Sequence, residues 1–155
     1  MKTRLRLLKQ YCESIFLYNS ELWTLNKKFE NTVDVFQRRL YRKLLQIKWP
    51  HIISNIALYN RVEEEPWSEK IRIKRLIWLG HIQRLPAETP ARKTYKERLR
   101  PVKRPRGGQR SNWINLINKD LKEKNLHPAG SEASFEESSD RRYWRSCILK
   151  EQAQS

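Results

Sequence analysis

Apolar residues recur three and four positions apart along most of the chain, which is the spacing of amphipathic α-helices, and the alternation typical of β-strands is scarce. This pattern predicts an all-α protein, a small irregular bundle of about five to six helices. The predicted helices cover residues 2–18, 27–48, 54–59, 68–84 and 111–124, followed by a final helix that starts at Ser139 or Asp140.

Polar residues at the predicted helix starts support these assignments. Asn26, Ser54 and Ser111 are suited to cap helices because their side-chain oxygens accept from backbone amides of the first turn. The clearest apolar face is expected on the second helix, and Gly80 in the helix over 68–84 would let another backbone approach closely. The residues of that second face are Phe29, Val33, Phe36, Leu40, Leu44 and Ile47.

Nearly every predicted helical unit carries one of the six tryptophans. Each would bury a large area at the cost of one polar atom, so core anchoring is favoured over base stacking for Trp78, Trp113 and Trp144. Trp49 and Trp67 flank predicted loops, and the sequence leaves their role open.

The chain is strongly basic, with 33 Lys and Arg against 17 Asp and Glu, a net charge of +16 and a pI near 10.2. The apolar share of 38% is below the usual level of about 45–50% but suffices for one modest core. A charge this high implies a partner of opposite sign, and nucleic acid is the obvious one.

Half of this excess lies between Pro90 and Arg110, where nine basic residues accompany a single acid, Glu97. Like charges, prolines and the Gly107-Gly108 pair predict an extended arm that binds phosphate groups. A solvated linker, or a nuclear import signal at residues 103–106, is the alternative. The predicted contacts are Arg92, Lys93, Lys96, Arg98, Arg100, Lys103, Arg104, Arg106 and Arg110.

Basic residues also line the predicted helices. Like charges at positions i and i+4 repel each other and destabilise an isolated helix. A bound phosphate would turn this repulsion into attraction, because it can accept from both side chains. A solvated face, partly neutralised by Asp34, is the alternative for the second helix. The helical candidates for nucleic-acid contact are Arg38, Arg39, Arg42, Lys43, Lys74, Arg75 and Arg84.

These features divide the chain into three segments. Residues 1–86 form a helical domain, residues 87–110 an extended basic linker arm, and residues 111–155 a C-terminal helical segment that includes an acidic linker over 129–140.

Catalytic and metal-binding patterns are missing from the sequence. Its three aspartates are scattered, so two-metal phosphoryl transfer is not expected. Histidines and the cysteines Cys12 and Cys147 lack the spacing of metal ligands or of a disulfide framework. The longest apolar run, residues 15–18, is too short to cross a membrane. We therefore expect an intracellular protein that is not an enzyme and has no metal or cofactor.

Several strings, in fixed order, are similar to the region after the polymerase core of non-LTR (LINE-type) retrotransposon reverse transcriptases. Residues 17–25 resemble that family's L-Y-G-S-E-T-W segment, and residues 38–42 its R-R-lined helix. Residues 75–86 resemble R-L-x-W-L-G-H-V-x-R-M-P, and residues 104–121 the R-P-R-G … W … D-L pattern. Residues 140–145 resemble the closing D-R-x-x-W-R, so the resemblance covers almost the whole chain.

The resemblance implies the thumb and post-thumb part of an endonuclease-reverse transcriptase, without its catalytic aspartate pair or nuclease. It implies RNA or DNA and the upstream polymerase core as partners, and a ribonucleoprotein found in nucleus and cytoplasm. Asn19 stands where the family has glycine, and Gly108-Gln109 where Arg-Pro is common. Such departures fit either a decaying copy of an element or ordinary divergence.

Our leading hypothesis is a module that holds template RNA or an RNA–DNA hybrid through phosphate contacts. One alternative is a scaffold segment that docks on the parent polymerase and uses the basic arm only as a spacer. A decayed fragment without activity is a second alternative. A helix-turn-helix DNA-binding domain is less favoured, because the helix over 68–84 lacks a short turn to a recognition helix.

Overall fold

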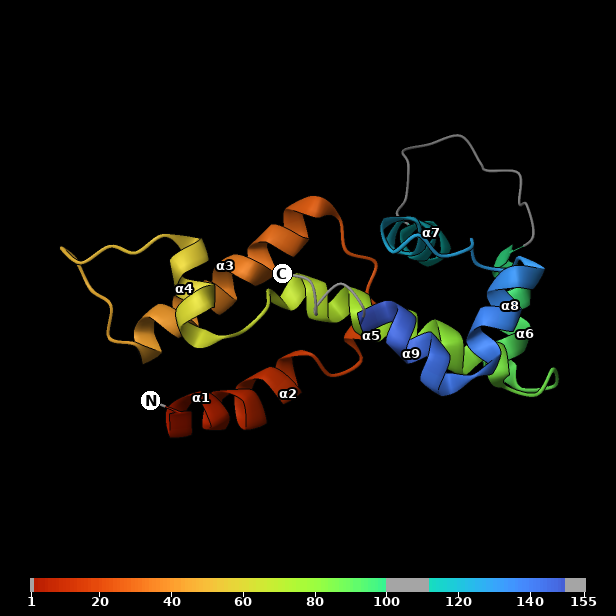
Figure 1. The fold of residues 1–155 in the computed structure, drawn as a ribbon, viewed down its shortest axis with the longest axis horizontal. Helices are drawn as coiled ribbons and strands as arrows, with labels where there is room; N and C mark the ends of the chain where they lie inside the picture. The colour runs from red at the N-terminus through yellow and green to blue at the C-terminus, as the bar shows by residue number, and fades with distance from the viewer. Residues whose placement is uncertain (1, 100–111, 150–155) are drawn as a thin grey trace. The chain divides into compact units, whose positions relative to one another are not determined.

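The computed structural model describes residues 2–99 and 112–149, and these ranges are helical without any strand (Figure 1). The all-α prediction is confirmed, although the described residues form more helices than the about five to six expected. The chain separates into two compact units. Unit 1 comprises Met1–Ser20 and Leu25–Ile71, and unit 2 comprises Glu21–Thr24 and Arg72–Ser155. This division falls within helix α5 (Trp67–Arg84), whereas the first domain boundary predicted from the sequence follows residue 86.

Unit 1 contains an N-terminal helical segment and the helices α3 and α4, and it ends with the first turn of α5. The N-terminal segment changes from α-helix to π-helix and back, and the prediction of one helix over 2–18 missed this change. Its parts are α1 (Lys2–Leu7), the π-helix η1 (Leu8–Glu13) and α2 (Ser14–Phe16). The other helices are α3 (Lys27–Leu44), α4 (Asn55–Val62) and α5 (Trp67–Arg84).

Two of the predicted caps are confirmed in unit 1. The Asn26 side chain accepts from the Phe29 amide at 2.9 Å, and the Ser54 hydroxyl accepts from the Ala57 amide at 3.1 Å. Each satisfies a backbone donor that the first helical turn leaves without an intrahelical partner. Asn19 adopts φ +53°, in the left-handed region that Asn tolerates better than most residues.

The buried face of α3 differs from the predicted one. Val33 is buried as expected, but Phe29 and Phe36 are 53% and 44% exposed, while Gln37 and Tyr41 are fully buried. Tyr41 forms a buried cluster with Leu58 and Val62 of α4. Leu5 and Leu8 of the N-terminal segment pack against this cluster. The apolar face read from spacing was therefore rotated by about one residue, because Gln37 finds polar partners inside the unit.

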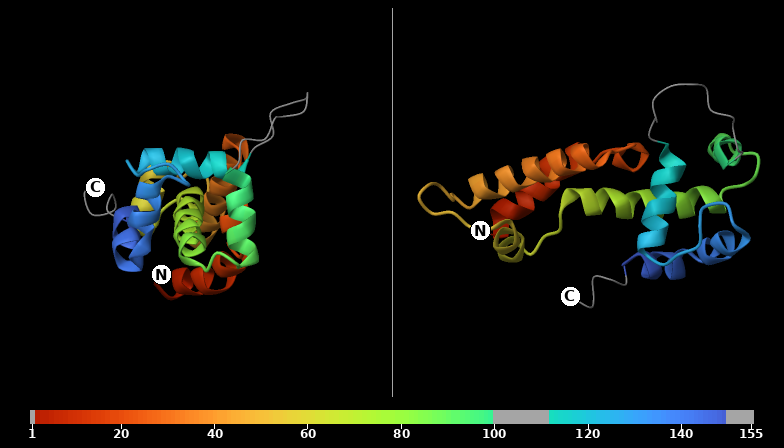
Figure 2. Two further views of the ribbon diagram at one scale, coloured as in Figure 1. Left: turned by 90° about the vertical axis from the view of Figure 1, so that its right-hand side faces the viewer. Right: turned by 90° about the horizontal axis from the view of Figure 1, so that it is seen from above.

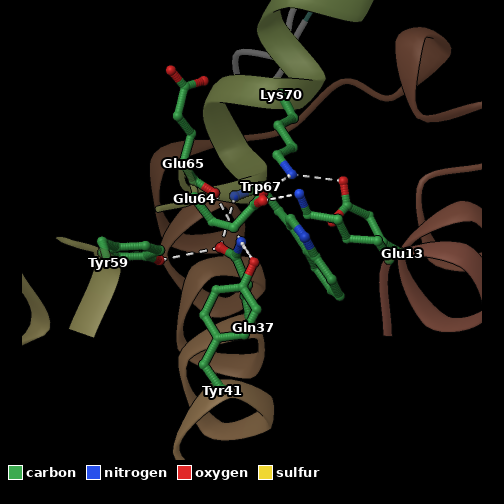
Figure 3. Close-up of polar contacts among 9 residues, drawn as sticks. Glu13, Gln37, Tyr41, Tyr59, Glu64, Glu65, Trp67 and Lys70 are labelled. Carbon is green, nitrogen blue, oxygen red and sulfur yellow. Dashed lines mark hydrogen bonds and ion pairs between the residues drawn. The ribbon is translucent and has the colours of Figure 1, made fainter. Parts of the chain in front are cut away.

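Those partners form a neutral hydrogen-bond network at the start of α5 (Figure 3). The Gln37 amide donates to the Tyr41 hydroxyl at 2.9 Å and to the Glu65 carbonyl at 2.8 Å. Its oxygen accepts from the Tyr59 hydroxyl at 3.1 Å and from the Trp67 amide at 2.9 Å. Gln37 thereby caps α5 from a neighbouring helix and fixes where that helix begins.

Trp67 and Trp49 are placed very differently. Trp67 is fully buried and stacks on Phe16, with ring centroids 4.8 Å apart, so it is a core residue of unit 1. Trp49 is 86% exposed. The sequence left both roles open, because proximity to a loop does not determine the burial of a side chain.

Unit 2 packs helices α6 to α9 around the remainder of α5 (Figure 2). The added helices are α6 (Pro90–Leu99), α7 (Trp113–Glu123), α8 (Glu132–Ser139) and α9 (Arg141–Leu149). A short 3-10 turn, η2 (Ser20–Leu22), leads into the segment 21–24 that belongs to this unit. The buried core consists of Leu76, Leu79, Ile82, Tyr95, Ile114, Ile117, Leu121, Trp144 and Ile148.

Gly80 allows a close approach, but the group that approaches is a side chain and not the expected backbone. The Trp144 indole lies over Gly80, where any Cβ would overlap its ring. The indole nitrogen donates to the Leu76 carbonyl at 2.9 Å. Trp144 is 2% exposed, so its predicted role as a core anchor is confirmed.

Two segments of unit 2 that were predicted to be linkers are helical in the structure. Residues 90–99 are helical rather than extended, because Pro90 is tolerated in the first turn and Tyr95 is buried in the core. The acidic linker over 129–140 is mostly helix α8, which Ser131 caps. Helix α7 is capped by Asn112, whose oxygen accepts from the Ile114 amide at 3.2 Å. Ser111, the predicted cap, lies outside the described residues.

Candidate nucleic-acid interface

A groove of about 580 Å³ in unit 2 is lined by one face of α5 together with residues of two other segments. The face consists of Lys74, Ile77, Trp78, His81 and Arg84, which recur at helical spacing. Glu21 and Arg141 complete the lining. Because a single regular helix supplies five of the seven lining residues, the groove is held by rigid backbone.

The aromatic part of the groove is formed by Trp78 and His81. Their ring centroids lie 5.1 Å apart with an interplanar angle of 31°. Trp78 is half-buried and packs against the core of unit 2, whereas His81 is exposed. The groove therefore offers a partly open aromatic surface that is supported from below by the core.

Two guanidinium groups line the same groove. Arg84 is held in place, because its Nη1 donates to the Ser138 carbonyl at 2.7 Å. Arg141 is the exposed first residue of α9, and Asp140 accepts from the Arg142 amide at 2.7 Å and thereby caps this helix. Burial and the nearby positive charge of Arg141 lower the pKa of Arg84. An anion in the groove would relieve the repulsion between the two cations.

Glu21 is placed by contacts of its own backbone. Its carbonyl accepts from the indole nitrogen of Trp113 at 2.8 Å. The carbonyl of neighbouring Trp23 accepts from Arg75 at 3.4 Å. These bonds tie the segment 21–24 to helices of unit 2 and bring one carboxylate to a groove that also carries three cations.

The predicted contacts on α3 lie in unit 1 and are exposed to different extents. Arg39 and Lys43 are exposed. Arg42 is half-buried and donates to the Asn55 side chain at 2.7 Å, and Arg38 is half-buried beside Tyr59. Arg39 and Lys43 therefore remain the α3 candidates best placed to meet a phosphate from solvent.

Arg75 was predicted as a nucleic-acid contact, and its position in the structure shows that this prediction is wrong. It is fully buried, and its Nε lies 2.8 Å from Oδ2 of Asp120. Burial, opposed by the Arg75 charge, raises the pKa of Asp120 to about 6. Arg75 therefore stabilises the joint between α5 and α7 and cannot reach a ligand in solvent.

Helix α6 carries four of the predicted contacts, of which Lys93, Lys96 and Arg98 are exposed. Lys93 pairs with Glu88 at 2.8 Å on the surface. The Arg92 guanidinium lies 4.6 Å from the Phe135 ring centroid and 5.9 Å from that of Tyr95, an arrangement typical of cation–π contacts. Arg92 thus packs two helices together, while Lys96 and Arg98 face solvent.

The remaining predicted contacts lie outside the described residues. These are Arg100, Lys103, Arg104, Arg106 and Arg110. Among the predicted residues that are described, the structure brings Lys74 and Arg84 into one groove and leaves the exposed residues of α3 and α6 elsewhere.

Five residues of the groove were not predicted as contacts: Glu21, Ile77, Trp78, His81 and Arg141. Trp78 and His81 had a detectable signal, since they share a helical face with Lys74 and Arg84. Arg141 and Glu21 had none, because each is far from α5 in the sequence and only tertiary packing brings it to the groove.

Comparisons of the chain with protein-family models, curated proteins and solved structures found no match. Within residues 2–99 and 112–149, no group of three or more His, Cys, Asp and Glu side chains is arranged to hold a metal ion. None of the described helices combines the length and the apolar character needed to cross a membrane.

Proposed function

We propose that this chain is a nucleic-acid-binding module that holds template RNA or an RNA–DNA hybrid through phosphate contacts and has no catalytic core of its own. The resemblance of its strings to the post-polymerase region of non-LTR retrotransposon reverse transcriptases supports a place beside an upstream polymerase. In that setting the module would work in a ribonucleoprotein of nucleus and cytoplasm.

The observation that carries this proposal is the different placement of acids and bases. Several carboxylates are used within the fold: Asp34 accepts from Ser68, Asp120 pairs with Arg75, and Glu64 pairs with Lys70. By contrast, Arg39 and Lys43 on α3 and Lys96 and Arg98 on α6 are exposed. These exposed bases keep part of the chain's net charge of +16 at the surface, which favours a polyanionic partner.

The salt dependence of RNA binding by the full chain tests this proposal. Contact of all nine basic residues of 90–110 with a single strand would give a slope of log K against log salt of about −6, from −0.7 for each contact. Because Arg92 packs against Phe135, we expect a somewhat shallower slope. Fluorescence anisotropy with labelled single-stranded RNA at several salt concentrations gives this slope. A slope near zero would refute phosphate-based binding.

Charge reversal then tests the location of the contacts. The variant Lys96→Glu/Arg98→Glu should make the slope shallower by about 1.4, and should weaken binding alike for all RNA sequences. Lys27→Glu/Lys28→Glu is the matched control, because it changes the charge equally at exposed positions outside the proposed contacts. Equal losses in both variants would mean that only net charge attracts the RNA.

A second candidate function is docking on the parent polymerase, and exposed apolar residues of unit 1 favour it. Tyr11, Ile15 and Tyr18 lie four and three residues apart and are 62%, 76% and 73% exposed. A run of this kind is suited to packing against another protein. This role predicts that the chain binds RNA no better than a variant in which residues 100–110 are scrambled, a change that leaves helix α6 and its core residue Tyr95 intact. Heparin should then compete equally well with RNA for both proteins.

A further inference from the structure

The phosphate contacts proposed above make no use of the aromatic rings in the groove of unit 2. We propose that this groove is a subsite for one unpaired nucleotide of a single strand, with the base against Trp78 and His81 and its phosphate at Arg84 and Arg141. The inference rests on the proposed function, because it specifies how one part of a bound strand is held.

The exposure of Trp78 supports a stacking role. Trp67 and Trp144 are 0% and 2% exposed, as expected for tryptophans that serve only the core. Trp78 is half-buried, lines the groove and has the exposed His81 ring beside it at 5.1 Å. A base that enters the groove would cover the open part of the indole, and stacking of this kind tolerates any base.

The two arginines are suited to a phosphate next to that base. Arg84 is pre-oriented by its hydrogen bond to the Ser138 carbonyl, so little side-chain freedom is lost on binding. The positive charge of Arg141 acts unfavourably on Arg84. A phosphate that accepts from both guanidinium groups changes this repulsion into two attractive contacts.

Glu21 and the shape of the groove favour an unpaired nucleotide over a longer phosphate track. Lys74 and Arg84 are ten residues apart on α5, which corresponds to about 15 Å along the helix. Glu21 lines the same groove and would repel additional phosphates near it. A base in a duplex is stacked and paired already, so its face is not available to Trp78.

Fluorine NMR of the full chain labelled with 5-fluorotryptophan tests this subsite directly. The Trp78 resonance is assigned with Trp78→Phe, which keeps an aromatic ring against the core. We expect this resonance to shift on titration with a short single-stranded RNA and to stay in place with an abasic strand of equal length. The RNA should bind about tenfold more tightly than the abasic strand for each stacked base.

Matched variants separate the groove from general charge. Arg141→Glu should weaken or abolish the Trp78 shift at a given RNA concentration, and His81→Ala should reduce it. Arg142→Glu is the control, since Arg142 is the next exposed residue of the same helix and does not line the groove. In this control the Trp78 shift should persist once the strand is bound.

The outcomes distinguish this subsite from the broader function. If RNA binds with the expected salt slope but the Trp78 resonance stays in place, or moves equally with the abasic strand or a duplex, the subsite is overturned and the proposed function stands. If RNA does not bind at all, the proposed function fails and the subsite with it. An equal shift with single-stranded DNA supports the subsite, because stacking requires only a base.

Discussion

Helix α5 carries the half-buried Lys70 and the fully buried Arg75, and the two units neutralise these cations in different ways. In unit 1, Nζ of Lys70 lies 2.7 Å from a carboxylate oxygen of Glu13 and of Glu64 (Figure 3). Lys9 also pairs with Glu64. In unit 2, Nε of Arg75 lies 2.8 Å from Oδ2 of Asp120. The Lys70 side chain keeps 22% of its surface exposed, whereas that of Arg75 is fully buried.

The two arrangements differ in the number of charged partners and in burial, and both factors determine whether desolvation or attraction dominates the pKa of the charged group. Burial alone would lower the pKa of Lys70, but the two carboxylates outweigh it and the pKa is raised. At Asp120 the order is reversed, because burial exceeds the effect of Arg75 and raises the pKa to about 6. Unit 1 therefore holds a partly exposed charge cluster in which two carboxylates share Lys70, and unit 2 holds a fully buried guanidinium group paired with Asp120.

The largest effect is expected when the buried pair of unit 2 is broken. Asp120→Ala leaves the Arg75 charge buried without its carboxylate, which should lower the free energy of unfolding by about 3–5 kcal/mol. Urea denaturation followed by circular dichroism measures this loss. Glu123→Ala is the control, since its pair with Arg72 is partly exposed and should cost no more than about 1 kcal/mol. Similar losses in both variants would contradict the special role of burial.

The titration of Asp120 should change the free energy of unfolding by a smaller amount, which a pH series can measure. The native state holds the Asp120 proton up to a pH of about 6, against a pKa of 3.8 in the unfolded chain. Its contribution to the free energy of unfolding should therefore decrease as the pH rises from about 4 to about 6, by at most about 3 kcal/mol. The difference between the native chain and Asp120→Asn isolates this contribution. A difference that changes in the opposite direction would show that attraction to Arg75 exceeds desolvation.

The smallest change in the free energy of unfolding is expected when an ion pair of Lys70 in unit 1 is removed. Glu13→Gln removes one of two carboxylates from Lys70, but Glu64 remains at 2.7 Å and water still reaches the site. The free energy of unfolding should fall by about 1 kcal/mol, as for partly exposed ion pairs. Urea denaturation at constant pH measures it. A loss as large as that of Asp120→Ala would remove the contrast between the two units.

Much of the helical framework could be predicted from the sequence. The start of α3 at Asn26, that of α4 at Ser54 and the extent of α5 were each close to the structure, because capping and helical periodicity act between near neighbours. The errors fell where short segments gain their structure from packing. Helix α6 is one example, since Tyr95 in the core stabilises a segment that charge and prolines made look extended.

The candidate interface was predicted only in part, because side-chain exposure is a tertiary property. Arg75 and Lys74 are adjacent in a basic stretch of sequence, yet Arg75 is buried with Asp120 while Lys74 lines the groove. Trp78 was assigned to the core, and the structure adds that it also lines the groove. Arg141 reaches the groove because α9 packs on α5 through Trp144 and Gly80.

By itself, the sequence determined the all-α character, most helix starts and the strong positive charge, because these depend on composition and on residues within one or two turns of each other. Tertiary structure decided which cations are buried, which are exposed and which meet in one groove with Trp78. The physical reason is that desolvation and pairing depend on neighbours in space, and those neighbours, such as Arg75 and Asp120, are distant along the chain.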